Sequence, residues 1–335
     1  AHTNDEMEKV RSEMAPKLSA HSDKILLNDA LFQRVNTLYD NRMDLGLDNE
    51  SVRLIEKYHT SFIRAGAKLN AEQKERLKAI NSEIAVLQTN FSQNVLKEVN
   101  ALAIVVDSKE KLEGLSESAI ESASNEAKSR GMEGKYVIAL KNTSGQPSLS
   151  SLKNRELRDR IHTTSLSRGS RGGTFDNREI LTNVLRLRAD KAKLLGYENH
   201  AAYTLEVQTA QTPQAVNERL GSLAPKSLAN AKREASDLQE MINASGESFS
   251  LSSWDWDYYT EKVRAERYSF DASQLKPYFE MDNVLQNGVF FAANQLFGLS
   301  FTERFDLPTY QEDVRVFEVF EEDGSTLAPV SYTHL

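Results

Sequence analysis

The stretch that begins at Asn70 restricts what this chain can fold into more than any other part of it. Apolar residues recur there every three or four positions, with Lys, Glu, Gln and Asn between them. This spacing places them along one side of a helix of about seven turns. The stripe consists of Leu77, Ile80, Ile84, Leu87, Phe91 and Val95. Asn70 and Gln73 form a capping pair for its start. So long an amphipathic helix needs partner helices, so the pattern predicts a helical hairpin or bundle.

Start and stop signals predict further helices along most of the chain. The start signals are Thr3 with Glu6 before a helix that runs towards Pro16, Thr212 with Pro213 before a long helix, and Ser253 before two aspartates. Residues 281–297 have a helical pattern that Gly298 would end. Residues 103–112 could form a short strand or an extended link, and residues 136–140 have the pattern of a short strand. We therefore expect a mainly α fold of long packed helices with a few short strands.

The C-terminal segment alternates apolar and polar residues and then turns. Residues 314–320 predict a strand, and Asp323 with Gly324 predicts a turn. A return strand starts at 325–328 but meets Pro329, which removes a donor from the ladder. We interpret this segment as a truncated β-hairpin followed by a non-native tail, residues 329–335. His334 lies in that tail and is therefore not interpreted as a metal ligand.

Composition excludes several classes of function. The net charge is −8, from 41 Lys and Arg against 49 Asp and Glu, which disfavours nucleic acid as a partner. No apolar stretch approaches the ~20 residues that span a bilayer, so no membrane role is expected. Cysteine is absent, which excludes disulfides and thiolate metal sites and suits the cytoplasm. The sequence starts at Ala1 rather than Met, so a processed or cut N-terminus stays open, and with it the periplasm.

The histidines do not form a recognisable metal motif. They are His2, His21, His59, His162, His200 and His334, and no two of them have the spacing of His-Glu-x-x-His. Glu56 and His59 make one Glu-x-x-His, half of a di-iron pattern, and the nearest second candidate, Asp159 with His162, has the wrong acid. We favour surface or helix-packing roles for these side chains.

Two further motifs have both a functional and a structural interpretation. Residues 167–173, Ser-Arg-Gly-Ser-Arg-Gly-Gly, lack the Lys of a phosphate-binding loop and offer only one short Arg-Gly segment for RNA. A mobile loop between helices is the favoured interpretation. The Trp-Asp-Trp-Asp-Tyr-Tyr run at 254–259 could form an aromatic platform for a sugar or peptide, with Asp255 and Asp257 as a carboxylate pair. We favour a capped helix start with inward aromatics. No Gly-x-Ser-x-Gly nucleophile motif occurs.

Several long stretches together resemble a known family. They are TNDEMEKVRSEMAPKLSAHSDKILLND, LNAEQKERLKAINSEIAVLQTNFSQNVL, KNRELRDRIHTTSLSRGSRGGTFDNREIL, LRADKAKLLGYENHAAYTLE, WDWDYYTEKVRAERYSFDASQLKPYFEMDNVLQNGVFFAANQLFGLSF and DVRVFEVFEEDGS. In this order they resemble the thimet oligopeptidase/neurolysin family of zinc metallopeptidases, over about residues 1–328. The resemblance is greatest to the bacterial peptidyl-dipeptidases, then to oligopeptidase A.

This resemblance implies a two-lobed helical peptidase with a deep channel for short peptides. Its zinc is held by the two His of His-Glu-x-x-His and a later Glu, and the Glu of that motif acts as general base on the metal-bound water. A peptidyl-dipeptidase releases dipeptides from a free C-terminus. We expect residues 1–245 to belong to the N-terminal-side lobe and 246–328 to start the catalytic lobe, with the zinc motif beyond them.

No position of this chain matches the zinc ligands or the base of that family. We therefore assign no catalytic and no metal-binding residue, and leave substrate-binding residues unassigned. The chain alone is expected to be inactive, whereas the full-length protein is expected to bind Zn2+ and short peptides as a monomer. The alternatives are an endopeptidase similar to oligopeptidase A, and a non-catalytic helical scaffold or peptide-binding module.

Overall fold

The computed structural model describes residues 3–143, 145–269 and 272–332. Contacts divide them into two compact units, a helical unit, Thr3–Val263, and a C-terminal unit, residues 264–332. The division falls inside one helix, α10 (Trp256–Tyr268). Helices dominate and the strands are short and antiparallel, so the predicted mainly α fold is confirmed. Within the described ranges no helix is both long enough and apolar enough to cross a bilayer.

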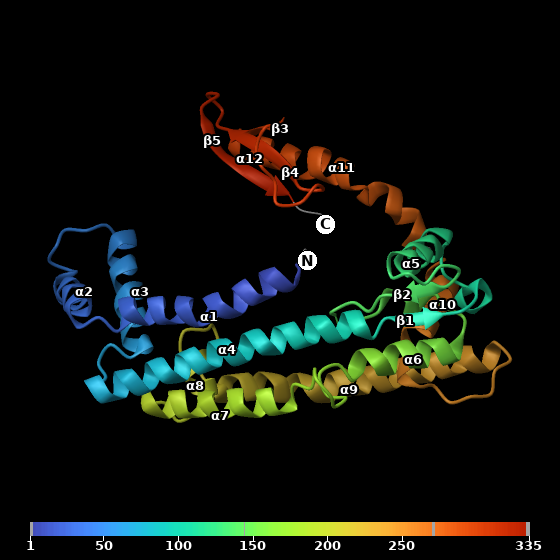
Figure 1. The fold of residues 1–335 in the computed structure, drawn as a ribbon, viewed down its shortest axis with the longest axis horizontal. Coiled ribbons are helices and arrows are strands. Elements are labelled where there is room, and N and C mark those ends of the chain that lie inside the picture. The colour runs from blue at the N-terminus through green and yellow to red at the C-terminus, as the bar shows by residue number, and fades with distance from the viewer. Residues whose placement is uncertain (1–2, 144, 270–271, 333–335) are drawn as a thin grey trace. The chain divides into compact units, whose positions relative to one another are not determined.

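The helical unit is built along its second-longest helix, α4 (Ala71–Ala101). This helix lies between α1 (Asp5–Leu26) and α7 (Arg178–Leu194) and packs against both (Figure 1). The predicted capping pair is confirmed, because Asn70 Oδ1 accepts from the Gln73 backbone N–H at 2.9 Å and Gln73 Oε1 accepts from the Asn70 N–H at 3.1 Å. The predicted apolar stripe faces inward, with Leu77 fully buried.

Further helices of this unit precede and follow α4 along the chain. They are α2 (Asp29–Asn41), α3 (Asn49–Ala65), α5 (Glu117–Ser129), α6 (Arg155–Leu166), α8 (His200–Leu205) and α9 (Pro213–Ala244), with the 3-10 turns η1 (Lys109–Leu112), η2 (Pro147–Ser150) and η3 (Ser253–Asp255). The predicted start of α9 is confirmed, since Thr212 Oγ1 accepts from the Ala215 N–H at 3.1 Å and Pro213 is the first helical residue.

The first helix differs from its prediction at both ends. Asn4 rather than Thr3 caps α1, accepting from the Met7 N–H at 2.8 Å, while the Thr3 hydroxyl donates to the Glu8 carboxylate. The helix also continues through Pro16 to Leu26. Proline removes one backbone hydrogen bond from a helix, but packing along a neighbouring helix can outweigh this loss. The packing of α1 on α4 provides that contact.

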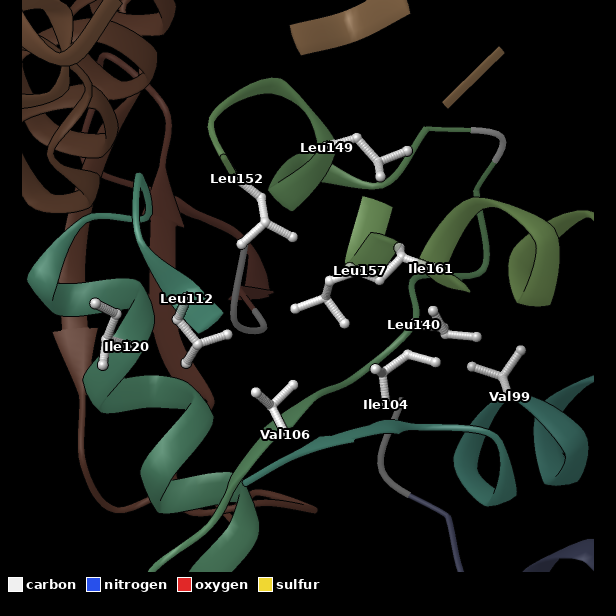
Figure 2. Close-up of a cluster of buried hydrophobic side chains, with 10 residues drawn as sticks. All are labelled: Val99, Ile104, Val106, Leu112, Ile120, Leu140, Leu149, Leu152, Leu157 and Ile161. Carbon is white, nitrogen blue, oxygen red and sulfur yellow. The ribbon is translucent and has the colours of Figure 1, made fainter. Parts of the chain in front are cut away.

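The principal apolar core of the helical unit surrounds a two-stranded sheet. Strand β1 (Ile104–Val106) pairs antiparallel with β2 (Tyr136–Ile138). Figure 2 shows side chains from β1, α5, α6 and the neighbouring turns around a common centre. The cluster consists of Val99, Ile104, Val106, Leu112, Ile120, Leu140, Leu149, Leu152, Leu157 and Ile161. Smaller cores form around Phe32 and Phe62, and around Leu238, Ile242 and Tyr259.

The C-terminal unit places irregular helices before a three-stranded sheet. Its helical elements are η4 (Ala272–Phe279), α11 (Met281–Val284), the π-helical η5 (Leu285–Phe290) and α12 (Phe291–Phe297). The helix predicted over 281–297 is therefore present but contains a π-helical turn. Its predicted end at Gly298 is confirmed, because that glycine adopts φ +72°, a left-handed conformation that side chains disfavour.

The sheet of this unit pairs the strands β3 (Ser300–Arg304), β4 (Arg315–Phe320) and β5 (Thr326–Tyr332) antiparallel in that order. The sequence predicted the return strand only as far as Ala328, but β5 pairs with β4 as far as Tyr332, with Pro329 opposite Glu318. Proline is tolerated here because β5 is an edge strand of this sheet. That residues 329–335 are a non-native tail stays a prediction.

Candidate functional site

The most enclosed acidic group in the helical unit is the carboxylate of Asp255, in the Trp-Asp-Trp-Asp run. Its side chain is 0% exposed. Arg158 Nη2 donates to Oδ1 at 2.7 Å, and Arg155 Nη2 donates to Oδ2 at 2.8 Å. The backbone N–H of Ser252 donates to Oδ2 at 3.2 Å. Both carboxylate oxygens are thus satisfied by two cations and one amide.

Local structure brings these groups together from distant parts of the chain. Asn154 caps α6 by accepting from the Leu157 N–H at 2.9 Å. Arg155 and Arg158 lie three residues apart on this helix, so their side chains are neighbours on the face that contacts η3. Ser252 forms a capping box with Asp255, so the predicted cap at Ser253 is wrong by one residue. The Asp255 carboxylate completes this box by accepting from the Ser252 backbone N–H.

Aromatic rings enclose the arginine side of this cluster. The Arg158 guanidinium lies 4.3 Å from the Tyr258 ring centroid, and that of Arg155 lies 4.0 Å from the Phe249 ring centroid. Tyr259 is buried in the neighbouring core, which agrees with the predicted inward aromatics. The sequence did not indicate that Asp255 is fully buried. Because it is, Asp255 and Asp257 do not form an exposed carboxylate pair.

The ionisation of Asp255 follows from these contacts. Burial by itself raises the pKa of a carboxyl group, because the charged form loses its hydration. Hydrogen bonds from Arg155, Arg158 and Ser252 favour the charged form and outweigh burial, so the pKa of Asp255 lies below its usual range. The cluster is therefore suited to fixing α6 against α10 through charge, rather than to exchanging a proton near neutral pH.

Glu56 and His59 match half of a di-iron pattern in the sequence, but their side chains contact different partners. Glu56 accepts from Arg42 at 3.3 Å and from Arg53 at 3.1 Å. The His59 ring stacks on Tyr39 with centroids 3.8 Å apart, and burial is the main cause that lowers its pKa. Charge pairing and ring packing account for both side chains.

The second candidate pair and the remaining histidines also form no ligand set. Asp159 accepts a hydrogen bond from Thr163 at 2.8 Å, and His162 meets the edge of Trp254. His2 and His334 lie outside the described residues. In the ranges 3–143, 145–269 and 272–332, no three His, Asp or Glu side chains gather where they could hold a metal ion. The zinc implied by the family resemblance therefore does not fit the described side chains.

The glycine-rich segment 167–173 is held at its start. Arg168 donates to the carbonyl oxygens of Lys141 at 2.7 Å and Thr143 at 2.9 Å. The Gly169 backbone N–H donates to the Glu98 carboxylate. The first arginine of this motif is thus engaged with backbone, while residues 170–173 are exposed.

A partly buried chain of polar side chains, which the sequence did not predict, crosses three helices. Lys191 Nζ on α7 donates to Asn81 Oδ1 on α4 at 2.7 Å, and Asn81 Nδ2 donates to Asp23 Oδ1 on α1 at 2.8 Å. Asp23 Oδ2 is buried and finds no hydrogen-bond partner among the described residues. Burial is the main cause that raises the pKa of Asp23, against the lowering effect of Asn81 and Lys191.

Comparison with known proteins gives the family. The model of peptidase family M3 matches residues 148–333, more than half of the chain, including α6, Asp255 and the C-terminal sheet. The chain belongs to peptidase family M3. The resemblance read from the sequence is thereby confirmed.

Curated relatives of this M3 chain match almost all of it. It is 41% identical over 328 residues to the dipeptidyl carboxypeptidase of Salmonella typhimurium, covering 98% of this chain and 48% of that protein. It is 39% identical to the dipeptidyl carboxypeptidase of Escherichia coli, with the same coverage. Oligopeptidase A of Escherichia coli is 28% identical, covering 95% of this chain and 47% of that protein. The M3 chain thus spans about half the length of these relatives.

Proposed function

We propose that this M3 chain is the N-terminal and middle part of a zinc peptidyl-dipeptidase that removes dipeptides from the C-terminus of short peptides. The observation that carries the proposal is the difference in identity among the relatives. Two dipeptidyl carboxypeptidases are 41% and 39% identical over 98% of the chain, whereas oligopeptidase A is 28% identical over 95%. The difference favours a peptidyl-dipeptidase over an endopeptidase.

In this proposal the described residues serve as scaffold. Residues 1–245 would form the N-terminal-side lobe and 246–328 the start of the catalytic lobe. Bound zinc supplies a Lewis acid that lowers the pKa of its water, but its ligands would come from polypeptide outside residues 1–335. The enclosed Arg155, Arg158 and Asp255 cluster would hold α6 against α10, close to the proposed border between the lobes. The chain alone would be inactive.

The proposed enzyme also has expected partners, an expected oligomeric state and an expected compartment. Its partners would be short peptides, without nucleic acid or membrane, and the full-length protein would be a cytoplasmic monomer. The net charge of −8 supports the exclusion of nucleic acid, and the absence of cysteine agrees with a reducing compartment.

The test uses the family-length protein, meaning a polypeptide of the relatives' full length that contains residues 1–335. It is incubated with a short peptide carrying a free C-terminus and with the same peptide amidated, each with and without a zinc chelator. Mass spectrometry should detect a released C-terminal dipeptide only from the free form without chelator. Internal cleavage of both peptides would instead indicate an endopeptidase similar to oligopeptidase A. No cleavage of either would favour the scaffold or peptide-binding module.

A further inference from the structure

A cleft lies where the end of α1 meets the start of α2, beside the first turns of α4. Its volume is about 500 Å³, which is within the range of small-molecule sites, roughly 300–1,000 Å³. Leu27 and two alanines give the wall an apolar part. The charged part consists of two carboxylates and two ammonium groups, those of Asp23, Asp29, Lys24 and Lys78. We call this site the α1–α2 cleft.

Asp23 is a carboxylate of this wall that makes no direct ion pair among the described residues. Its side chain is 8% exposed. Oδ1 accepts from Asn81 at 2.8 Å, whereas Oδ2 is buried and has no hydrogen-bond partner there. Lys78, on the same wall, donates to Glu75 at 2.7 Å instead. Because a buried carboxylate oxygen without a donor costs free energy, Asp23 favours a positively charged donor in the cleft.

The other charged groups of the wall also retain capacity for a ligand. Asp29 accepts from Lys74 Nζ, but its side chain is 82% exposed, so its carboxylate can accept further hydrogen bonds. Lys24 is exposed and has no hydrogen-bond or ion-pair partner in the part of the chain that the structure describes. The cleft thus offers acceptors for an ammonium group and a donor for a carboxylate.

We propose that the α1–α2 cleft binds a small zwitterion, a free amino acid or a short peptide. Its ammonium group would bind at Asp23 and Asp29, and its carboxylate at Lys24 and Lys78. A simple cation or a simple anion fits less well, because each would face two like charges. Asp23 Oδ2 is covered in this structure, so the ammonium group would reach it by displacing a side chain of the wall. This site lies within residues 1–335 and does not depend on zinc or on which bond the enzyme cleaves.

Isothermal titration calorimetry of the 335-residue chain with glycyl-leucine tests the proposal. N-acetyl-glycyl-leucine lacks the ammonium group and glycyl-leucinamide lacks the carboxylate, so each should bind at least tenfold more weakly than glycyl-leucine. Free leucine distinguishes the two sources of the zwitterion. Leucine that binds as tightly as the dipeptide would assign the cleft to amino acids, and weaker binding would assign it to short peptides.

Matched variants locate the binding in the cleft. Asp23→Asn keeps the shape of the side chain and removes its charge, so it should weaken glycyl-leucine binding at least tenfold. Asp44→Asn changes an exposed carboxylate outside the cleft and should leave the affinity unchanged. Lys24→Gln removes an exposed ammonium group and should weaken binding of glycyl-leucine but not of glycyl-leucinamide. It keeps the test available if Asp23→Asn fails to fold, which circular dichroism would detect.

Three results would overturn the proposal. Glycyl-leucine that shows no saturable binding at millimolar concentration would mean that the cleft takes no such ligand. Equal affinity for the blocked dipeptides would mean that the charges at the two ends of the ligand are not recognised. Unchanged affinity in both Asp23→Asn and Lys24→Gln would place the binding elsewhere. A failure of the cleavage assay on the family-length protein would leave this inference intact, because a dipeptide bound to the 335-residue chain is measured without any cleavage.

Discussion

Arg158 and Asp255 form an ion pair that is enclosed within the helical unit. Arg158 Nη2 lies 2.7 Å from Asp255 Oδ1, and the two residues are 97 positions apart in the sequence. Their exposed fractions are 1% and 0%. Removing one partner from such a pair leaves an uncompensated buried charge, which costs far more than losing an exposed pair. The pair thus makes the contact between α6 and the start of α10 sensitive to single substitutions.

Asp255→Ala should lower the free energy of unfolding by about 3–5 kcal/mol, because it leaves Arg155 and Arg158 without their carboxylate. Asp257→Ala is the matched control, since it removes an exposed carboxylate from the same helix start. It should cost less than about 1 kcal/mol, through the helix dipole alone. Urea unfolding followed by circular dichroism measures both, and equal losses would contradict the importance of the enclosed pair.

Acid should weaken the protein partly through Asp255. Its native pKa lies below that of the unfolded chain, about 3.9. The stabilisation is therefore complete above the unfolded pKa and is lost as the pH falls through the native pKa. Asp255→Asn should be less stable than the parent at pH 6, with a gap that narrows towards pH 2. A gap of constant size in urea unfolding across this range would refute the assignment.

Asp23→Asn should stabilise the protein at pH 7 by about 1 kcal/mol, because it keeps the shape of the side chain but removes the negative charge that burial disfavours. The raised native pKa means that ionising Asp23 costs stability as the pH rises from the unfolded pKa through the native pKa. The gain should therefore disappear below about pH 4. Asp44→Asn changes an exposed carboxylate and should stay within about 0.5 kcal/mol. Destabilisation by Asp23→Asn at pH 7 would mean that its charge is compensated.

Ile161→Ala should cost about 2–5 kcal/mol, since the side chain is fully buried in the cluster of Figure 2 and its removal leaves a cavity. Leu166→Ala on the same helix removes a side chain that is 67% exposed. That change should stay within about 0.5 kcal/mol. Thermal or urea unfolding of the two variants compares them directly, and similar losses would place Ile161 outside the stabilising core.

Much of the helical architecture could be predicted because its signals are local. The Asn70 and Gln73 cap, the Thr212 and Pro213 start and the Gly298 stop each depend on residues within one helical turn. The errors are also local and small, such as the one-residue shift of the cap to Ser252. They arise because neighbouring serines, threonines and asparagines compete for the same backbone N–H groups.

The contacts that enclose charge could not be predicted, because their partners are far apart in the sequence. Asp255 has the pattern of an ordinary acidic first turn until Arg155 and Arg158 are placed beside it. Likewise, Asp23 and Lys191 belong to different helices and meet only through Asn81. Helical periodicity identifies apolar stripes, but it does not identify which stripe faces the core. The apolar residues of α1 face outward, because Glu8 and Ser12 on its other side hydrogen-bond to Gln93 of α4, a contact that periodicity does not encode.

The central proposal is that this M3 chain is part of a zinc peptidase whose metal ligands and general base lie outside residues 1–335. The most direct measurement is zinc content, together with hydrolysis of a short quenched peptide, for the 335-residue chain and the family-length protein side by side. The family-length protein should bind zinc stoichiometrically and turn over the peptide, whereas the 335-residue chain should do neither. Stoichiometric zinc with peptide turnover by the 335-residue chain alone would contradict the account.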